Sequence, residues 1–256
     1  MAAVLKDANT YQHIDPADVG NIQRILVSEL SGRGNIITKA KQLGLYKENG
    51  DELRNEEEDK AWKNRARQIL ERVKKLENKG YTFEGAEASV ELMIRRSMPN
   101  YKAPFELIDF TVLTGNRRAE LEIGQLINKD VTQATVKLNL VGGGIGGERR
   151  ETKTCLEVGE GNGPVDAVNV ALSKTLMKEF KRLRDVGLID YKVRILDNES
   201  ATRAITRVMV VFRDCKTQET WTTVNVSRNI IVASVGALMD GFEYAMTRYL
   251  PECVGH

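Results

Sequence analysis

Histidine is nearly absent from this chain, since its 256 residues include only His13 and His256. Two histidines so far apart argue against a histidine-based metal site, which usually takes its ligands from short motifs. Cysteine is also rare, with Cys155, Cys215 and Cys253 at wide intervals and without paired spacing. An odd number of such cysteines favours reduced thiols, and therefore a cytoplasmic setting, over a disulfide framework.

Long apolar runs are missing as well. The longest extends from Ile230 to Met239, far short of the roughly 20 residues that span a bilayer. The first residues, Met1 to Asn9, have no apolar core behind basic residues, so they do not resemble a secretory signal. We therefore expect a soluble cytoplasmic protein with no membrane partner.

The chain has no excess charge of either sign, because 38 Lys and Arg balance 36 Asp and Glu. Its basic clusters, Arg117-Arg118, Arg149-Arg150 and Lys178 to Arg184, are not interleaved with aromatic residues, which make up only 6% of the chain. Nucleic-acid surfaces usually combine concentrated positive charge with stacking side chains. The sequence therefore predicts no nucleic-acid partner.

Catalytic motifs are missing too: there is no serine elbow, paired-histidine motif or Walker loop. Gly142 to Gly147 has the glycine spacing of a dinucleotide fingerprint, but Glu148 to Glu151 begin a predicted strand rather than a helix. Without a helix start behind the glycines, a mobile hairpin tip is the favoured interpretation. We expect no catalytic residues and no cofactor in this chain.

Residues 1–100 are predicted to be mostly helical. Helices are expected from about Ile36 to Leu43, from near Asn55 to Lys79, and from about Glu84 to Met98. The middle helix carries an apolar stripe at helical spacing, formed by Trp62, Ala66, Ile69, Leu70, Val73 and Leu76. The two prolines of Pro99 to Pro104 suit a linker, so the second domain is expected at residues 101–256.

Residues 101–256 contain an internal repeat. Leu107 to Val112 is matched by Leu188 to Val193, both alternating like strands, and the helix expected from Val165 is matched by one from Ile231. The first of these helices has an apolar face at helical spacing, formed by Val165, Val168, Leu172, Leu176, Phe180 and Leu183. Each copy is predicted as strand, strand, strand, helix. The predicted fold class is therefore α+β: a helical linker region followed by a pseudo-symmetric, doubled βββα domain.

The two predicted helix starts are the candidate ligand site. In the first, a glycine turn precedes Pro164 at the first helical position, and in the second Ser227 or Asn229 can cap the helix. Free backbone N–H groups at such starts suit a carboxylate, so an α-amino acid is the hypothesis and a capped helix without a ligand is the alternative. The candidate residues are Gly161, Asn162, Gly163, Pro164, Ala167, Tyr191, Asn225, Ser227, Asn229 and Ile230.

Several segments resemble a known family over nearly the whole chain. Tyr11 to Pro16, Leu26 to Arg33 and Tyr81 to Ser89 resemble the linker region of citramalate synthases. The regulatory domain shared with 2-isopropylmalate synthases is similar to three further segments, Glu160 to Ala167, Leu188 to Arg194 and Val224 to Ser234. The resemblance implies a homodimer that binds the end product of its pathway: isoleucine in citramalate synthases, which join acetyl-CoA and pyruvate, and leucine in the other branch.

The resemblance also implies a separate catalytic barrel with a divalent metal, to which no part of this chain is similar. The chain alone is therefore expected to be inactive, with a barrel-bearing domain or subunit as a possible partner. His13 and Tyr46 are candidates for reaching its active site, but the favoured interpretations are a polar surface residue for His13 and a loop anchor for Tyr46.

The chain departs from the family pattern in its second repeat. Thr222 and Asn225 stand where relatives commonly have glycine, and Val232 and Val235 where a glutamate and a tryptophan are frequent. These departures favour the alternative of an assembly module that dimerises without binding an effector.

Overall fold

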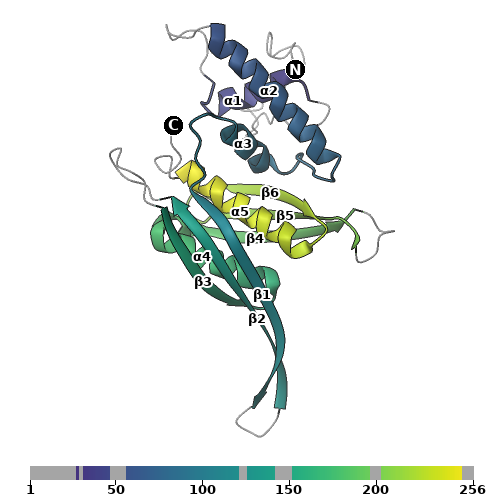
Figure 1. Ribbon diagram of the computed structural model, residues 1–256, viewed down its shortest axis with the longest axis vertical. Helices are drawn as coiled ribbons and strands as arrows, with labels where there is room; N and C mark the ends of the chain where they lie inside the picture. Colours follow the sequence, from purple (N-terminus) through teal and green to yellow (C-terminus); the bar gives the residue numbers. More distant parts are fainter. Residues whose placement is uncertain are drawn as a thin grey trace. The chain divides into compact units, whose positions relative to one another are not determined.

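The computed structural model describes residues 27–28, 31–46, 56–120, 126–141, 152–196 and 203–249. The chain divides into two compact units, residues 1–98 and 99–256, which we describe separately (Figure 1). Helices form the described part of the first unit, and two three-stranded antiparallel sheets with two long helices form that of the second. The predicted α+β class is confirmed.

The first unit contains α1 (Arg33–Gln42), α2 (Glu56–Glu77) and α3 (Glu87–Arg96). Five members of the predicted α2 stripe are buried, and Leu76 is half-buried. The helix α3 is shorter than expected. It begins only after a turn in which the Ala86 N–H bonds the Phe83 carbonyl, and it ends where the Ser97 hydroxyl donates to the Ile94 carbonyl at 2.6 Å.

The second unit repeats one arrangement twice, as predicted. In the first half β1 (Phe105–Glu120), β2 (Leu126–Val141) and β3 (Thr152–Gly161) precede α4 (Pro164–Glu179). A short 3₁₀ helix, η3 (Lys181–Asp185), leads to β4 (Val186–Ile195), β5 (Thr206–Asp214), β6 (Thr220–Ser227) and α5 (Ile230–Tyr249). The two sheets have the orders β1-β2-β3 and β4-β5-β6.

A shared irregularity supports the repeat in detail. The register between β1 and β2 shifts between Leu107 and Asp109, and that between β4 and β5 shifts between Leu188 and Asp190. Both shifts fall in the matched Leu-Ile-Asp segments. The residues left without a partner in the ladder, Ile108 and Ile189, are the second residues of these segments, and both side chains are exposed.

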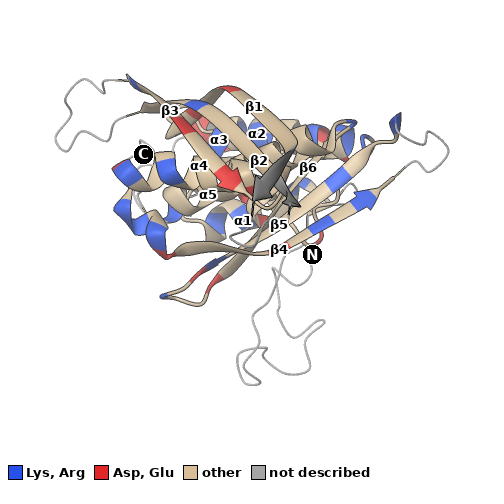
Figure 2. Cartoon of the chain, turned by 90° about the horizontal axis from the view of Figure 1, so that it is seen from below, with Lys and Arg blue, Asp and Glu red and all other residues tan. Residues whose placement is uncertain are grey.

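The core of this unit lies between each sheet and its helix. The helix α4 packs on β2 and β3, α5 packs on β5 and β6, and the two helices contact each other. Figure 2 shows both helices between the two sheets. Alternate residues of the central strands are buried toward the helices: Ala134, Val136, Leu138 and Leu140 on β2, and Val208, Val210 and Phe212 on β5.

The predicted apolar face of α4 is longer than the helix itself. Its spacing continues to Leu183, but α4 ends at Glu179 because Phe180 leaves helical geometry, with φ −117° and ψ 80°. Leu183 is buried from η3 instead. The periodicity therefore identified core residues correctly and placed the helix end wrongly.

Among the described residues α5 alone is long and apolar enough to cross a membrane, and 67% of its most apolar stretch is buried inside the protein. Internal contacts hold it: Trp221 Nε1 donates to the Gly241 carbonyl at 3.1 Å, and the Thr223 hydroxyl to the Ala237 carbonyl at 2.7 Å. It has the burial of a core helix. Cys155 and Cys215 are free thiols. Cys253, His13 and the segment Gly142–Gly147, which is predicted to be a hairpin tip, lie outside the described residues.

Candidate functional site

Glycines bring the end of β3 against the first turn of α4. A Cβ atom on Gly161 would lie 2.4 Å from the Ala167 backbone nitrogen, and one on Gly159 would lie 2.3 Å from the Ala167 carbonyl oxygen. Gly163 differs, because a Cβ there would meet nothing within 4 Å, and its φ of −166° is open to any residue. A side chain would therefore crowd this turn at position 159 or 161, but not at position 163.

The start of α4 keeps donors available. Pro164 occupies the first turn as predicted, and Gly163 precedes it as an N-cap that has no side chain to accept a hydrogen bond. The Asp166 carboxylate reaches back instead, accepting the Asn162 N–H at 2.9 Å. The geometry offers first-turn N–H groups to an anion, while the negative charge of Asp166 nearby opposes one.

The start of α5 is capped by its own side chains. Asn229 Oδ1 accepts the N–H groups of Ile231 at 2.9 Å and Val232 at 3.4 Å, and the Ser227 hydroxyl accepts the Asn229 N–H at 3.1 Å. Capping by these two residues follows the sequence prediction. The same bonds occupy N–H donors that a ligand carboxylate would need. The two helix starts therefore differ, because α5 has a side-chain cap and α4 has none.

Tyr191 joins the α5 start from the neighbouring strand. Its hydroxyl lies 2.8 Å from Ser234 Oγ, and Ser234 in turn donates to the Ile230 carbonyl at 2.6 Å. On the same strand, a hydrogen bond from the Lys192 ammonium outweighs desolvation and holds the pKa of the Asp190 carboxyl below its usual value. The predicted residues Tyr191 and Ile230 are thus brought together.

Asn225 has a packing role that explains its departure from the family pattern. A Cβ on Gly236 of α5 would lie 2.3 Å from the Asn225 amide nitrogen. The amide therefore fills the space that Gly236 leaves open between β6 and α5. The substitution is accommodated, and it places a polar group beneath the second turn of the helix.

Apolar side chains surround the same end of the second half. Val193 and Ile195 on β4 are 41% and 56% exposed, and Ile230 at the start of α5 is 41% exposed. A branched aliphatic side chain would gain hydrophobic contact on such a surface. The Tyr191 and Ser234 hydroxyls are bonded to each other, and Ser234 is fully buried, so this surface offers a ligand mainly apolar contact.

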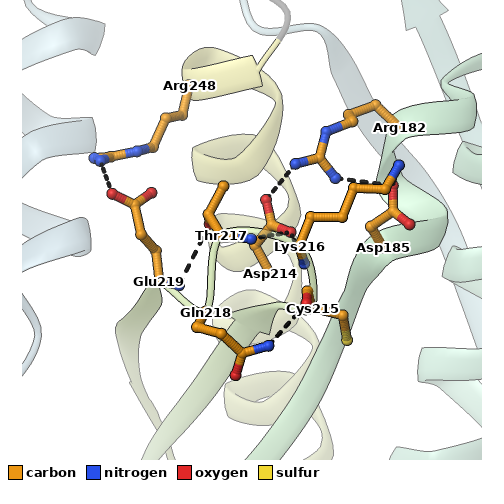
Figure 3. A network of polar contacts seen from close by, with 9 residues as sticks. All are labelled: Arg182, Asp185, Asp214, Cys215, Lys216, Thr217, Gln218, Glu219 and Arg248. Carbon is orange, nitrogen blue, oxygen red and sulfur yellow. Dashed lines mark hydrogen bonds and ion pairs between the residues drawn. The ribbon is translucent and has the colours of Figure 1, made fainter.

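A second polar cluster lies at the opposite end of β5 (Figure 3). The Arg182 guanidinium lies between two carboxylates, 2.5 Å from the fully buried Asp214 and 2.9 Å from Asp185. Asp214 also accepts the Lys216 N–H at 2.7 Å, and Arg182 lies over the Tyr249 ring at 4.6 Å. The cluster holds η3, the β5–β6 turn and the end of α5 together, so we assign it a structural role.

The Asp214 carboxyl has a strongly perturbed pKa. Burial alone would raise it, but hydrogen bonds from the Lys216 backbone and Arg182 outweigh burial and hold the pKa well below the ordinary range. Asp214 therefore remains ionised at neutral pH.

Metal binding finds no support in the described parts of the chain. No group of three or more His, Cys, Asp and Glu side chains there could hold a metal ion. Tyr46 donates to Asp59 at 3.3 Å and packs edge-on against Trp62, so it has the contacts of a loop anchor.

Sequence reasoning missed several residues at these sites. Ser234, Gly159 and Gly236 act through contacts with other elements. Only Ser234 left a local signal, since it lies four residues after Ile230 and thus on the same helix face.

Comparison with known proteins places this geometry in context. Residues 84–246 match a family described as the LeuA allosteric (dimerisation) domain. The chain is 37% identical over 246 residues to the (R)-citramalate synthase of Geobacter sulfurreducens and 36% identical over 248 residues to that of Aquifex aeolicus. It is 37% identical over 246 residues to the enzyme of Synechocystis. Each alignment covers 96% of this chain but only 40–41% of the relative, so the chain spans about two fifths of the length of these relatives.

Proposed function

Because the chain belongs to the family of LeuA allosteric (dimerisation) domains, we propose that it is the regulatory part of a citramalate synthase-like acyltransferase. In this role it forms a homodimer in the cytoplasm and binds a branched-chain amino acid, with isoleucine as the first choice and leucine as the second. The family match over residues 84–246 is the observation that carries the proposal.

The division of labour with a catalytic barrel belongs to the same proposal. The relatives' names describe whole enzymes, and this chain aligns with about two fifths of each. A barrel domain or subunit would supply the condensation of acetyl-CoA with pyruvate and the divalent metal, which the described residues do not fit. This chain would need no cofactor of its own.

The α4 start is the better half of the proposed effector site. Its first-turn N–H groups have no side-chain cap among the described residues, whereas Asn229 already occupies those of α5. An amino-acid carboxylate is therefore expected at α4, around Gly163 and Pro164. The capped α5 start favours the second candidate function, a dimerisation module that binds no effector.

Isoleucine should raise the melting temperature of this protein. At a hundredfold excess over its dissociation constant, one-site binding stabilises the native state by about 2.7 kcal/mol, which corresponds to a shift of about 5 °C or more at this size. Thermal unfolding with isoleucine, leucine, alanine and glutamate measures the effect, and only the first two should act.

The matched variant is Gly163→Val. A Cβ atom there would meet nothing within 4 Å, so the main cost without ligand is that of valine at the N-cap, about 1 kcal/mol. The melting temperature without ligand should therefore fall by only about 2–4 °C. The isoleucine shift should disappear, because the added methyl groups lie where a carboxylate would approach the first-turn N–H groups. If neither isoleucine nor leucine shifts the melting curve of the wild-type protein, the effector-binding function is wrong and the dimerisation module without an effector is favoured.

The chain should also behave as a dimer. Light scattering at micromolar concentration is expected to give a particle of twice the 28.7 kDa chain mass, because the matched family is described by dimerisation. A single-chain mass at that concentration would contradict this part of the proposal.

A further inference from the structure

The segment that leads from the first unit into β1 has few anchors. Pro99, Asn100, Lys102 and Ala103 are all exposed. Tyr101 is half-buried, and Pro104 is buried, with its carbonyl accepting the Val141 N–H at 2.9 Å. Tyr101 lies five residues after Arg96, the end of α3. It is therefore the first side chain after α3 and its closing turn that holds this segment to the second unit.

The partner of Tyr101 lies deep in α5. The Tyr101 hydroxyl donates to Glu243 Oε1 at 2.5 Å across 142 residues of sequence. Glu243 is only 5% exposed and lies in a stretch of α5, Gly241 to Thr247, in which every residue is buried. A hydrogen bond to a buried carboxylate is worth more than one between neutral groups, so this contact holds the segment firmly.

We propose that the Tyr101–Glu243 hydrogen bond is a latch that transmits changes in the second unit, through α5 and segment 99–104, to the unit formed by residues 1–98. The segment is covalently continuous with α3, so a shift or loosening of α5 that moves Glu243 also moves the chain entering the first unit. The inference does not depend on any ligand. A purely structural role, in which Tyr101 only satisfies a buried carboxylate, is the competing explanation.

The two tryptophans make the test possible, because Trp62 lies in α2 of the first unit and Trp221 in β6 of the second. Labelling the full chain with 5-fluorotryptophan gives one ¹⁹F resonance per unit, assigned with Trp62→Phe. Urea unfolding then yields a midpoint for each unit in the same sample. Val208→Ala perturbs the second unit beneath α5, since Val208 is fully buried on β5.

With the latch intact, Val208→Ala should lower the Trp221 midpoint and also the Trp62 midpoint. In the Tyr101→Phe background the Trp221 shift should persist, whereas the Trp62 shift should fall to less than roughly half. Glu243→Gln retains an acceptor and should preserve transmission, whereas Glu243→Met should lose it. This pair decides the matter even if Tyr101→Phe folds poorly.

Tyr46→Phe is the matched control, because it removes a tyrosine hydroxyl bond inside the first unit. It should lower the Trp62 midpoint and leave the response to Val208→Ala intact. The latch is overturned if Val208→Ala leaves the urea midpoint reported by Trp62 unchanged in the otherwise wild-type chain. It is equally overturned if Tyr101→Phe lowers the midpoints while leaving that response at full size, as a purely structural role requires.

Discussion

Replacing Gly159 with alanine should destabilise the second unit by about 3 kcal/mol, the upper part of the range for overpacked cores. The new Cβ would lie 2.3 Å from the Ala167 carbonyl oxygen and 2.5 Å from the Ala171 backbone nitrogen. Both neighbours are helix backbone, so α4 as a whole must move away from β3. Urea unfolding followed by the ¹⁹F resonance of Trp221 measures the loss.

Gly163→Ala is the control for this substitution. It changes the same residue type four positions later, where a Cβ would meet nothing within 4 Å. Because Gly163 is the N-cap of α4, alanine there should cost at most about 1 kcal/mol, well below the loss expected at Gly159. Equal effects of the two substitutions would show that α4 does not press on β3 as described.

Replacing Asp214 with asparagine should cost about 3 kcal/mol of stability. Asp214 is fully buried, and the substitution leaves Arg182, which is about one quarter exposed, without its buried counter-charge. Partial exposure of Arg182 keeps the expected loss at the lower end for buried pairs. Asp185→Asn removes a more exposed carboxylate from the same guanidinium and should have a much smaller effect.

The Asp214 contribution should vanish in acid. Its pKa is lower in the folded protein than in the unfolded chain, where an aspartate titrates near 3.9. The stabilisation is therefore fully present above about pH 4 and is lost as pH falls toward the folded pKa. The stability difference between wild type and Asp214→Asn should stay constant from pH 7 to about pH 5 and shrink below pH 4. A constant difference down to pH 3 would contradict the assigned ionisation.

Local signals in the sequence predicted much of the fold. The α2 stripe, the helix start at Pro164, the Asn229 cap and the matched Leu-Ile-Asp segments all lie where the sequence indicated. Each of these depends on residues within a few positions of one another, and their spacing carries the information. The α4 end was misplaced because apolar spacing continues into η3 although the backbone does not.

The sequence by itself determined the doubled βββα order, the core-facing residues of its helices and the scarcity of catalytic and metal-binding groups. The tertiary structure decided that Gly159, and not Gly163, lies against the backbone of α4. It also decided that Tyr191 contacts Ser234 and that Tyr101 contacts Glu243. It also showed that one candidate helix start is already capped and the other is not. These outcomes depend on how sheets and helices stack. Residues separated by 43 to 142 positions then come within hydrogen-bond distance, and no local periodicity records that proximity.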